Sequence, residues 1–304
     1  MSIATKLTAL SGHIANAYDA VDAKGGTIPA NKNMANLDDA ILSIPSGGGE
    51  YTGIPREVSA AGVYQWPSES FTFTLPSNAT SMGRYVMQGA FENCTTLTSA
   101  DLSSLTAACG QYCLSHAFDG CYALTSVDLS SLITTVGTDT GEYSMQYIFY
   151  HCWDLTSVNL GSLTTVGPHS LSNAFYECRS LTTVGSNSAA SVNLGSLTTV
   201  GPNGFSSAFR GCTSLTSAEF SSLTTMGSSS FSYAFNGCSH LTSLSFPALT
   251  TSSFGTATNQ FNNMLNSVTG CTVHFPAAIQ STIESWPDVI AGFGGTNTTV
   301  LFDL

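Results

Sequence analysis

Positive charge is nearly missing from this chain. Seven lysines and arginines face 19 aspartates and glutamates among 304 residues, so the formal net charge is −12. Charged residues make up 9% of the chain, against about 25% in an average soluble protein. A surface that follows nucleic-acid phosphates or anionic lipids needs clustered Lys and Arg. The sequence therefore predicts neither a nucleic-acid partner nor an anionic membrane partner.

The chain also lacks the uninterrupted run of about 18 apolar residues that a membrane-spanning helix needs. Its first residues, Met1–Leu7, do not combine a basic start, an apolar run and a cleavage site of small residues, so they are not typical of a secretion signal. We therefore expect a protein that is made in the cytoplasm, does not insert into a membrane, and leaves a cell by lysis or within an assembled particle.

What the chain does contain is an internal repeat. A phenylalanine, preceded by alanine in most copies, recurs at steps of 26 to 34 residues, with Cys three residues later and Leu three residues after that. A fixed period with occasional insertions is the signature of a solenoid. The six full copies are Phe91–Cys94–Leu97, Phe118–Cys121–Leu124, Phe149–Cys152–Leu155, Phe175–Cys178–Leu181, Phe209–Cys212–Leu215 and Phe235–Cys238–Leu241, and a degenerate copy begins at Phe261.

Two strand-like segments follow the leucine of each copy, such as Thr156–Leu160 and Ser162–Gly167. Their apolar residues alternate with Thr, Ser, Asn and Asp, so the apolar ones should stack into internal ladders. A partial rung precedes the first copy at Phe71–Leu75, and a last rung lies at Cys271–Phe275. The predicted fold is an α/β repeat, a β-rich leucine-rich-repeat solenoid over residues 63–276 with short helices or turns in each rung.

Residues 277–304 depart from the repeat and are predicted to cap it, because a terminal repeat has no neighbour to cover its open end. Ile279, Ile283 and Trp286 share one face of a predicted helix, and an apolar strand follows at Thr298–Phe302.

Nine cysteines invite a metal or disulfide interpretation. Zinc sites use clustered pairs of ligands, whereas six of these cysteines occur one per copy, and a buried free cysteine behaves as a small hydrophobic residue. We therefore predict core packing, no metal site and no cofactor. Cys109 and Cys113 are the one close pair; both are expected in the core, with a local disulfide or metal site as the alternative.

Catalytic motifs are missing too. Neither a Gly-x-Ser-x-Gly elbow nor a phosphate-binding glycine loop occurs. His151 and Cys152 are adjacent, and adjacent residues on a rung point to different sides. Asp101, Asp128 and Glu219 hold equivalent repeat positions; paired carboxylates can hydrolyse glycosides, but the periodicity favours solvated strand positions. We predict that the chain is not an enzyme.

Two positions of the repeat vary freely, one directly after each Phe and one directly after each Cys. We expect these residues on a solvent-facing edge, where Trp, Tyr and Arg are typical of binding hot spots and aromatic faces also suit sugar rings. The alternative is that they only pack on neighbouring rungs. Two insertions, Thr138–Tyr143 and Gly185–Ser191, are predicted loops. The candidate binding residues are Tyr122, Tyr150, Trp153, Tyr176, Arg179 and Arg210, and we call them the aromatic–arginine edge.

Residues 1–46 do not follow the repeat pattern and are predicted to form a small α-helical module. Its first apolar residues follow a heptad spacing over about three heptads, which predicts a coiled-coil seam. The seam predicts attachment or homo-oligomerisation, with a trimer as one option; the alternative is an intramolecular helical hairpin. Ser46–Gly49 opens a flexible linker over residues 47–62. The seam residues are Ile3, Leu7, Leu10, Ile14 and Val21.

The repeat motif, Ala-Phe-x-x-Cys-x-x-Leu-Thr-x-Val-x-Leu, resembles the BspA-like class of leucine-rich repeats over roughly residues 71–276. Members of that class are surface or secreted bacterial proteins, often adhesins, and related repeats occur in prophage-encoded proteins. The resemblance implies a binding surface without a cofactor.

The opening of the chain is similar to the N-terminal segments of bacteriophage tail-associated proteins, in Thr5–Leu7, Lys24–Gly26 and Asn36–Pro45. That likeness implies a virion protein whose partners are other tail proteins and a bacterial surface receptor, either a glycan or a protein. The alternative is a bacterial cell-surface adhesin of the BspA-like class.

Overall fold

The computed structural model describes most of the repeat region and little of what precedes it. The predicted helical module and its heptad seam lie outside the described residues, so both stay predictions. The described residues are 57–58, 64–65, 70–74, 87–104, 110–130, 142–160, 162–185, 191–254, 259–285 and 293–304.

The chain divides into two compact units, of which Ser70–Leu75 and Thr80–Leu304 make up the second. In the first unit the described residues form one antiparallel pair, β1 (Glu57–Val58) with β2 (Tyr64–Gln65). No described helix is long and apolar enough to cross a membrane.

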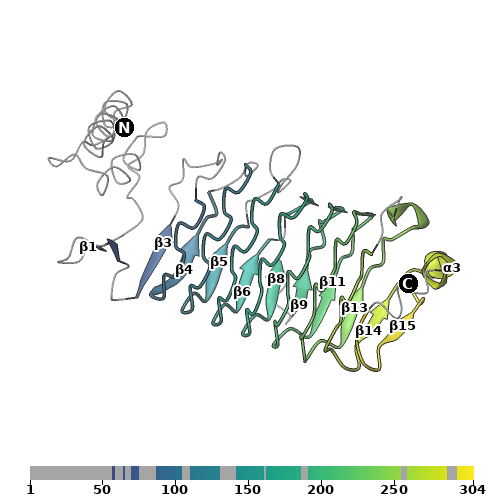
Figure 1. Cartoon of the computed structure of the whole chain (residues 1–304). Coiled ribbons are helices and arrows are strands. Elements are labelled where there is room, and N and C mark those ends of the chain that lie inside the picture. The colour runs from purple at the N-terminus through teal and green to yellow at the C-terminus, as the bar shows by residue number, and fades with distance from the viewer. Residues whose placement is uncertain are drawn as a thin grey trace, which may run out of the picture. The chain divides into compact units, whose positions relative to one another are not determined.

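The second unit is a parallel β-solenoid, which confirms the predicted fold class. Ten short strands lie side by side in sequence order, each hydrogen-bonded to the strand of the next rung (Figure 1). The strands are β3 (Phe71–Thr74), β4 (Leu97–Asp101), β5 (Ser126–Asp128), β6 (Ser157–Asn159), β8 (Thr183–Gly185), β9 (Ser191–Asn193), β11 (Ser217–Glu219), β13 (Ser243–Ser245), β14 (Thr272–His274) and β15 (Thr299–Leu301).

The insertion predicted as a loop at Gly185–Ser191 is in part sheet. Gly185 ends β8 and Ser191 begins β9, and the two strands pair in parallel with Val184 opposite Val192. This copy of the repeat is longer than most because it adds one strand to the sheet. Residues 186–190 between the strands are outside the described part.

In three rungs the strand of the main sheet is followed along the chain by a second short strand, and these three strands form a smaller sheet. It consists of β7 (Thr165–Val166), β10 (Thr199–Val200) and β12 (Thr225–Met226), all parallel. The hydroxyl of the threonine before β10 and before β12 donates to the preceding rung: Thr198 Oγ1 to the carbonyl oxygen of Thr164 at 3.1 Å, and Thr224 Oγ1 to that of Thr198 at 3.3 Å. The predicted strand-like segment Ser162–Gly167 is therefore confirmed at its centre.

The remaining part of each rung is a nine-residue turn segment. Its first, middle and last residues have positive φ, and we call them left-handed residues. In the segment 203–211 these residues are Asn203, Ser207 and Gly211, with φ of 54°, 54° and 75°. Turn structure rather than helix therefore forms these segments. A 3-10 helix, η1 (Thr251–Phe254), lies between β13 and β14. The six complete turn segments are 112–120, 143–151, 169–177, 203–211, 229–237 and 259–267.

Backbone hydrogen bonds in a turn segment alternate in direction. The N–H of Phe205 donates across to Ser230 of the next rung at 2.8 Å, and the N–H of Ser206 donates back to Asn203 at 3.1 Å. This alternation continues along residues 203–212, so each N–H there has an acceptor. Because buried backbone donors must be paired, the pattern fixes the register between rungs.

The predicted ladders fill the core. The six repeat phenylalanines are fully buried, and successive rings stack with centroids 5.2 to 5.6 Å apart. The cysteine thiols lie beside them and donate to the phenylalanine carbonyl of the preceding rung, as from Cys178 Sγ to Phe149 O at 3.0 Å. The other such pairs are Cys121–Phe91, Cys152–Phe118, Cys212–Phe175 and Cys238–Phe209, at 3.0 to 3.1 Å.

Cys113 differs from the ladder cysteines. It is fully buried, as predicted, but it is disulfide-bonded, which was the alternative interpretation of this pair. Its sequence neighbour Cys109 lies outside the described residues.

The C-terminal segment contains a shorter helix than predicted. A 3-10 turn, η2 (Ala277–Ile279), leads into α3 (Gln280–Glu284), and the side chains of Ile279 and Ile283 are buried. Trp286 lies outside the described residues. The predicted final strand is present as β15, which adds to the main sheet as its last strand.

We expect the ladder thiols to be unreactive in the folded protein, because burial raises the pKa of Cys152, Cys178 and Cys212 well above that of an ordinary thiol and the pKa of Cys271 to about 12. The thiolate is the reactive form. Reaction with an aromatic disulfide reagent at neutral pH should be at least about 100-fold slower than with free cysteine. Unfolding without reductant should release seven thiols. Fast stoichiometric labelling of the native chain would contradict the dry ladder.

Candidate functional site

The residues directly after each ladder cysteine form one column of stacked side chains. The rings of Tyr122 and Trp153 lie 4.3 Å apart between centroids, at 20° to each other. The guanidinium carbon of Arg179 lies 5.5 Å from the centroid of the Trp153 ring, and Arg179 Nη2 donates to Glu177 Oε2 at 2.6 Å. Trp153 is therefore held between a ring and a cation, yet it remains 40% exposed.

The residues directly after each ladder phenylalanine form a second column. Tyr150 and Tyr176 stack at 4.8 Å and 26°, and the guanidinium carbon of Arg210 lies 5.3 Å from the Tyr176 centroid. His151 connects the two columns, with its ring centroid 4.0 Å from Tyr150 and 6.5 Å from Trp153. The structure thus brings the six predicted residues of the aromatic–arginine edge together.

The columns follow from the register of the rungs. Strands of neighbouring rungs lie about 4.8 Å apart, which is close to the preferred separation of offset-stacked rings. Residues at equal repeat positions therefore meet face to face. Burial raises the pKa of Tyr150 first, and its neighbours Tyr176 and Asp119 raise it further. Its phenol therefore stays protonated at neutral pH and can donate a hydrogen bond.

The edge extends over side chains that the sequence analysis missed. Tyr147 contacts Tyr150 edge-on at 5.3 Å and stacks on His116 at 4.6 Å. Tyr143 stacks on Tyr112 at 5.1 Å and on His169 at 4.7 Å. The signal that could have revealed them is the spacing of four residues between Tyr143, Tyr147 and His151 in one copy.

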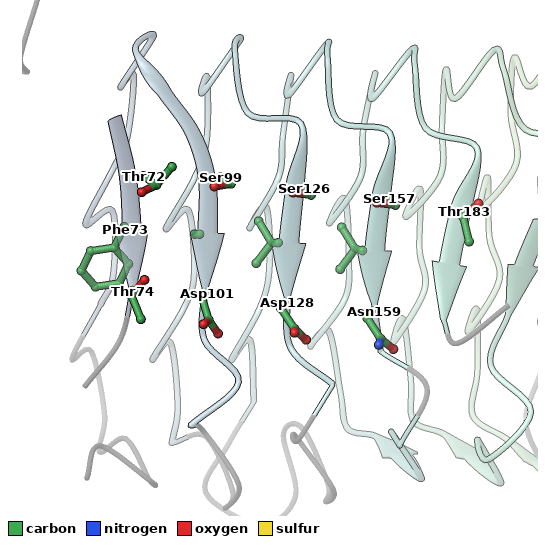
Figure 2. Close-up of a pocket in the computed structure, with 13 residues that line it drawn as sticks. Thr72, Phe73, Thr74, Ser99, Asp101, Ser126, Asp128, Ser157, Asn159 and Thr183 are labelled. Atoms are coloured by element: carbon green, nitrogen blue, oxygen red, sulfur yellow. The ribbon is translucent and has the colours of Figure 1, made fainter. Parts of the chain in front are cut away.

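A second candidate surface is the outer face of the main sheet, where β3, β4, β5, β6 and β8 line an open groove of about 640 Å³. Figure 2 shows one row of hydroxyls across successive strands, including Ser99, Ser126 and Ser157. A parallel row carries Asp101, Asp128 and Asn159. This groove is polar, shallow and repetitive.

The repeat belongs to a known family. A model of the BspA type leucine rich repeat region, in six copies, matches residues 64–191 and 115–269, which together span more than half of the chain. The chain belongs to the BspA-type leucine-rich-repeat family. The repeat motif had predicted this membership, and the stacked rungs agree with it.

Comparison with curated proteins found no match to this BspA-type chain. Among solved structures, it is similar to internalin C2 from Listeria monocytogenes str. 4b F2365, at 13% identity and a TM-score of 0.30, over 86% of this chain and 92% of the other. It is also similar to a leucine-rich repeat protein from Bacteroides ovatus ATCC 8483, at 16% identity and a TM-score of 0.29, over 78% and 71%. No conclusion about function rests on either likeness.

The carboxylates of the BspA-type sheet face have a structural role. Asp101 Oδ1 accepts from the N–H of Ser103 at 2.9 Å, and Asp128 Oδ1 accepts from Ser130 at 2.8 Å, so each closes the turn after its strand. The hydroxyl and the N–H of Ser103 lower the pKa of Asp101. A glycosidase acid needs a raised pKa, so Asp101 is not suited to that role.

The adjacent residues His151 and Cys152 lie in different parts of the rung. Cys152 is buried in the ladder, whereas the ring of His151 lies in the aromatic–arginine edge. Within the described part of the chain, no group of three or more His, Cys, Asp or Glu side chains is placed to hold a metal ion. The BspA-type scaffold is typically used for binding rather than for catalysis, and its aromatic–arginine edge is the surface best arranged for it.

We expect Asp101→Ala to lower the free energy of unfolding by about 1 kcal/mol, because Ser103 loses a hydrogen-bond acceptor. Asp101→Asn should cost less, since Asn193 accepts from Gly195 at the equivalent position. The folded-state pKa of Asp101 is lowered, so its contribution is present above the unfolded pKa and is lost as pH falls through the folded one. Urea unfolding at neutral and acidic pH checks this; an equal gap between wild type and Asp101→Ala at both would contradict it.

Proposed function

We propose that this chain is a non-enzymatic binding protein that recognises a receptor on a bacterial cell surface through the aromatic–arginine edge. The observation that supports this most is the arrangement of six Tyr, Trp and Arg side chains in two columns joined by His151. Trp, Tyr and Arg are the residue types most enriched at binding hot spots. Here they stand on a scaffold that does not need them for its core.

Preorganisation supports the same proposal. Each arginine is already held against a ring, Arg179 over Trp153 and Arg210 over Tyr176. Long side chains that are ordered before binding lose less conformational entropy when a partner arrives. The edge is therefore suited to bind a partner without first rearranging.

We place this protein in a bacteriophage tail, where it contacts other tail proteins and is made in the host cytoplasm. The support is the likeness of residues 1–45 to tail-associated proteins, a segment outside the described residues. Oligomerisation through the predicted seam would multiply weak binding sites by avidity. The second candidate, a bacterial cell-surface adhesin, is favoured by the family match, because the BspA-like class includes such adhesins.

The edge is tested by Trp153→Thr, which gives this column the residue type that it carries at Thr95 and Thr213. We expect binding of the labelled chain to intact bacterial cells, screened over a panel of strains, to weaken about 30-fold, equivalent to about 2 kcal/mol. The matched control is Thr213→Ala in the same column, which should bind like the wild type. Equal binding by Trp153→Thr and wild type, with unchanged folding, would remove the edge from the proposal.

The seam is tested by Leu10→Asp and Ile14→Asp, which place charge at two predicted core positions of the coiled coil. Light scattering should find the full chain oligomeric and both variants dissociated, because a buried unpaired charge is strongly destabilising. Virions of the producing phage should contain the protein, whereas an adhesin would be found on intact, unlysed cells. A monomeric wild-type chain would leave the helical hairpin as the better interpretation.

A further inference from the structure

The left-handed residues of the turn segments form three columns along the solenoid, and aromatic side chains gather at one end of them. The first column contains Tyr112, Tyr143 and His169, followed by Asn203, Ser229 and Asn259. The second contains Gly89, His116 and Tyr147, followed by Asn173, Ser207, Tyr233 and Asn263. In these two columns the aromatic rings therefore concentrate in the turn segments 112–120, 143–151 and 169–177, and small polar residues replace them in most later rungs.

The fold does not require these rings. Glycine and asparagine adopt positive φ most readily, and bulkier residues do so at a cost. Asn203 and Ser207 close the same turns with the same hydrogen bonds as Tyr143 and Tyr147. A residue type that is held in an unfavourable backbone region, where a cheaper one would serve the fold, points to a role outside the fold.

The geometry of the rings limits what they can recognise. Tyr112 and Tyr143 are almost parallel, at 2°, and His169 covers the other face of Tyr143 at 15°. His116 and Tyr147 stack at 18°. In these stacks the ring faces are largely turned toward each other, and all five side chains are half-buried. A sugar that binds by stacking needs an open ring face, whereas edges and hydroxyls suit the carbonyls and side chains of a protein.

The charge around the rings is negative. In and beside the turn segments 112–120, 143–151 and 169–177 the described carboxylates are Asp119, Glu142, Asp154 and Glu177. The arginines of the adjoining edge are Arg179, which is paired with Glu177, and Arg210. Asp119 accepts from or pairs with His116 Nδ1 at 2.8 Å, and Glu142 and Asp154 are exposed beside Tyr143 and Trp153. Complementary charge steers association, so this surface suits a partner that carries lysine or arginine around the contact.

We infer that Tyr112, His116, Tyr143, Tyr147 and His169 form a second recognition surface, continuous with the aromatic–arginine edge, for a folded protein with basic side chains. We call it the tyrosine–histidine face. Its three tyrosines are of the residue type most used in antibody paratopes, in which rigid aromatic side chains give contact area at a low entropic cost. The inference rests on the proposed function, since it names the class of receptor that the edge recognises.

The test compares two variants of the same column, Tyr147→Asn and Tyr233→Asn. Both remove a tyrosine at positive φ and introduce the residue that the column carries at Asn173 and Asn263. The variants are compared on a bacterial strain that the wild-type chain binds. We expect Tyr147→Asn to weaken binding at least 10-fold and Tyr233→Asn to change it less than 2-fold. Tyr143→Asn, whose column carries Asn203, is the second variant and should behave like Tyr147→Asn. Thiol protection and circular dichroism verify that each variant is folded.

Treatment of the same cells identifies the class of partner. Proteinase K should abolish binding of the wild-type chain, periodate oxidation of surface glycans should leave it unchanged, and raising the salt concentration from 50 to 500 mM should weaken it. Binding that survives protease and is lost after periodate would overturn the inference in favour of a glycan while the proposed function stands. Equal binding by folded Tyr147→Asn and Tyr233→Asn would also overturn it. If no strain binds the wild-type chain, the proposed function itself fails.

Discussion

The structure depends on hydrogen bonds that run from each rung to the next. In the turn segments, as over residues 203–212, alternate N–H groups cross to a carbonyl of the following rung, and the N–H groups between them close turns within their own rung. The phenylalanine carbonyl of one rung accepts twice, as Phe149 O does from the N–H of Cys152 and from Cys178 Sγ. A thiol is small enough to fit beside the ring and still donates weakly, which explains why cysteine occupies a position where alanine or valine would leave that carbonyl with one donor fewer.

This fixed register separates the residues that make the fold from those that can make a binding site. Phe, Cys and Leu fill the interior at the same place in each full copy of the repeat, while the residue types at the positions after Phe and after Cys vary from rung to rung. Side chains at these outer positions must nevertheless stack, because their neighbours lie one strand spacing away. The same column carries Thr213 in one rung and Trp153 in another. The surface therefore differs between these rungs, whereas the path of the chain does not.

Features in which one residue type recurs from rung to rung could be predicted from the sequence. Features in which only the backbone conformation recurs could not. The Phe and Cys ladders, the strands and the six residues of the aromatic–arginine edge were predictable because one residue type or one alignment column marks each of them. The left-handed columns were not, because Tyr, His, Asn, Ser, Glu and Gly share a backbone region there and no side-chain property. The pairing of β8 with β9 was not predicted, because parallel strands ordinarily need a longer connection than the one between Val184 and Val192.

The aromatic residues of the left-handed columns also show why such a face grows by contiguous rungs. An aromatic residue at positive φ costs roughly 1 kcal/mol relative to glycine or asparagine, and one stacking contact returns about 0.5–1.5 kcal/mol. Tyr143 has a ring on each side and so offsets its backbone cost, whereas the ring of Tyr233 lies among small residues and its hydroxyl instead accepts from Asn263 Nδ2 at 3.1 Å. Stacking makes the cluster tolerable without making it necessary. A solenoid can therefore gain or lose such a face a rung at a time, and the face borders the edge because the same register aligns both.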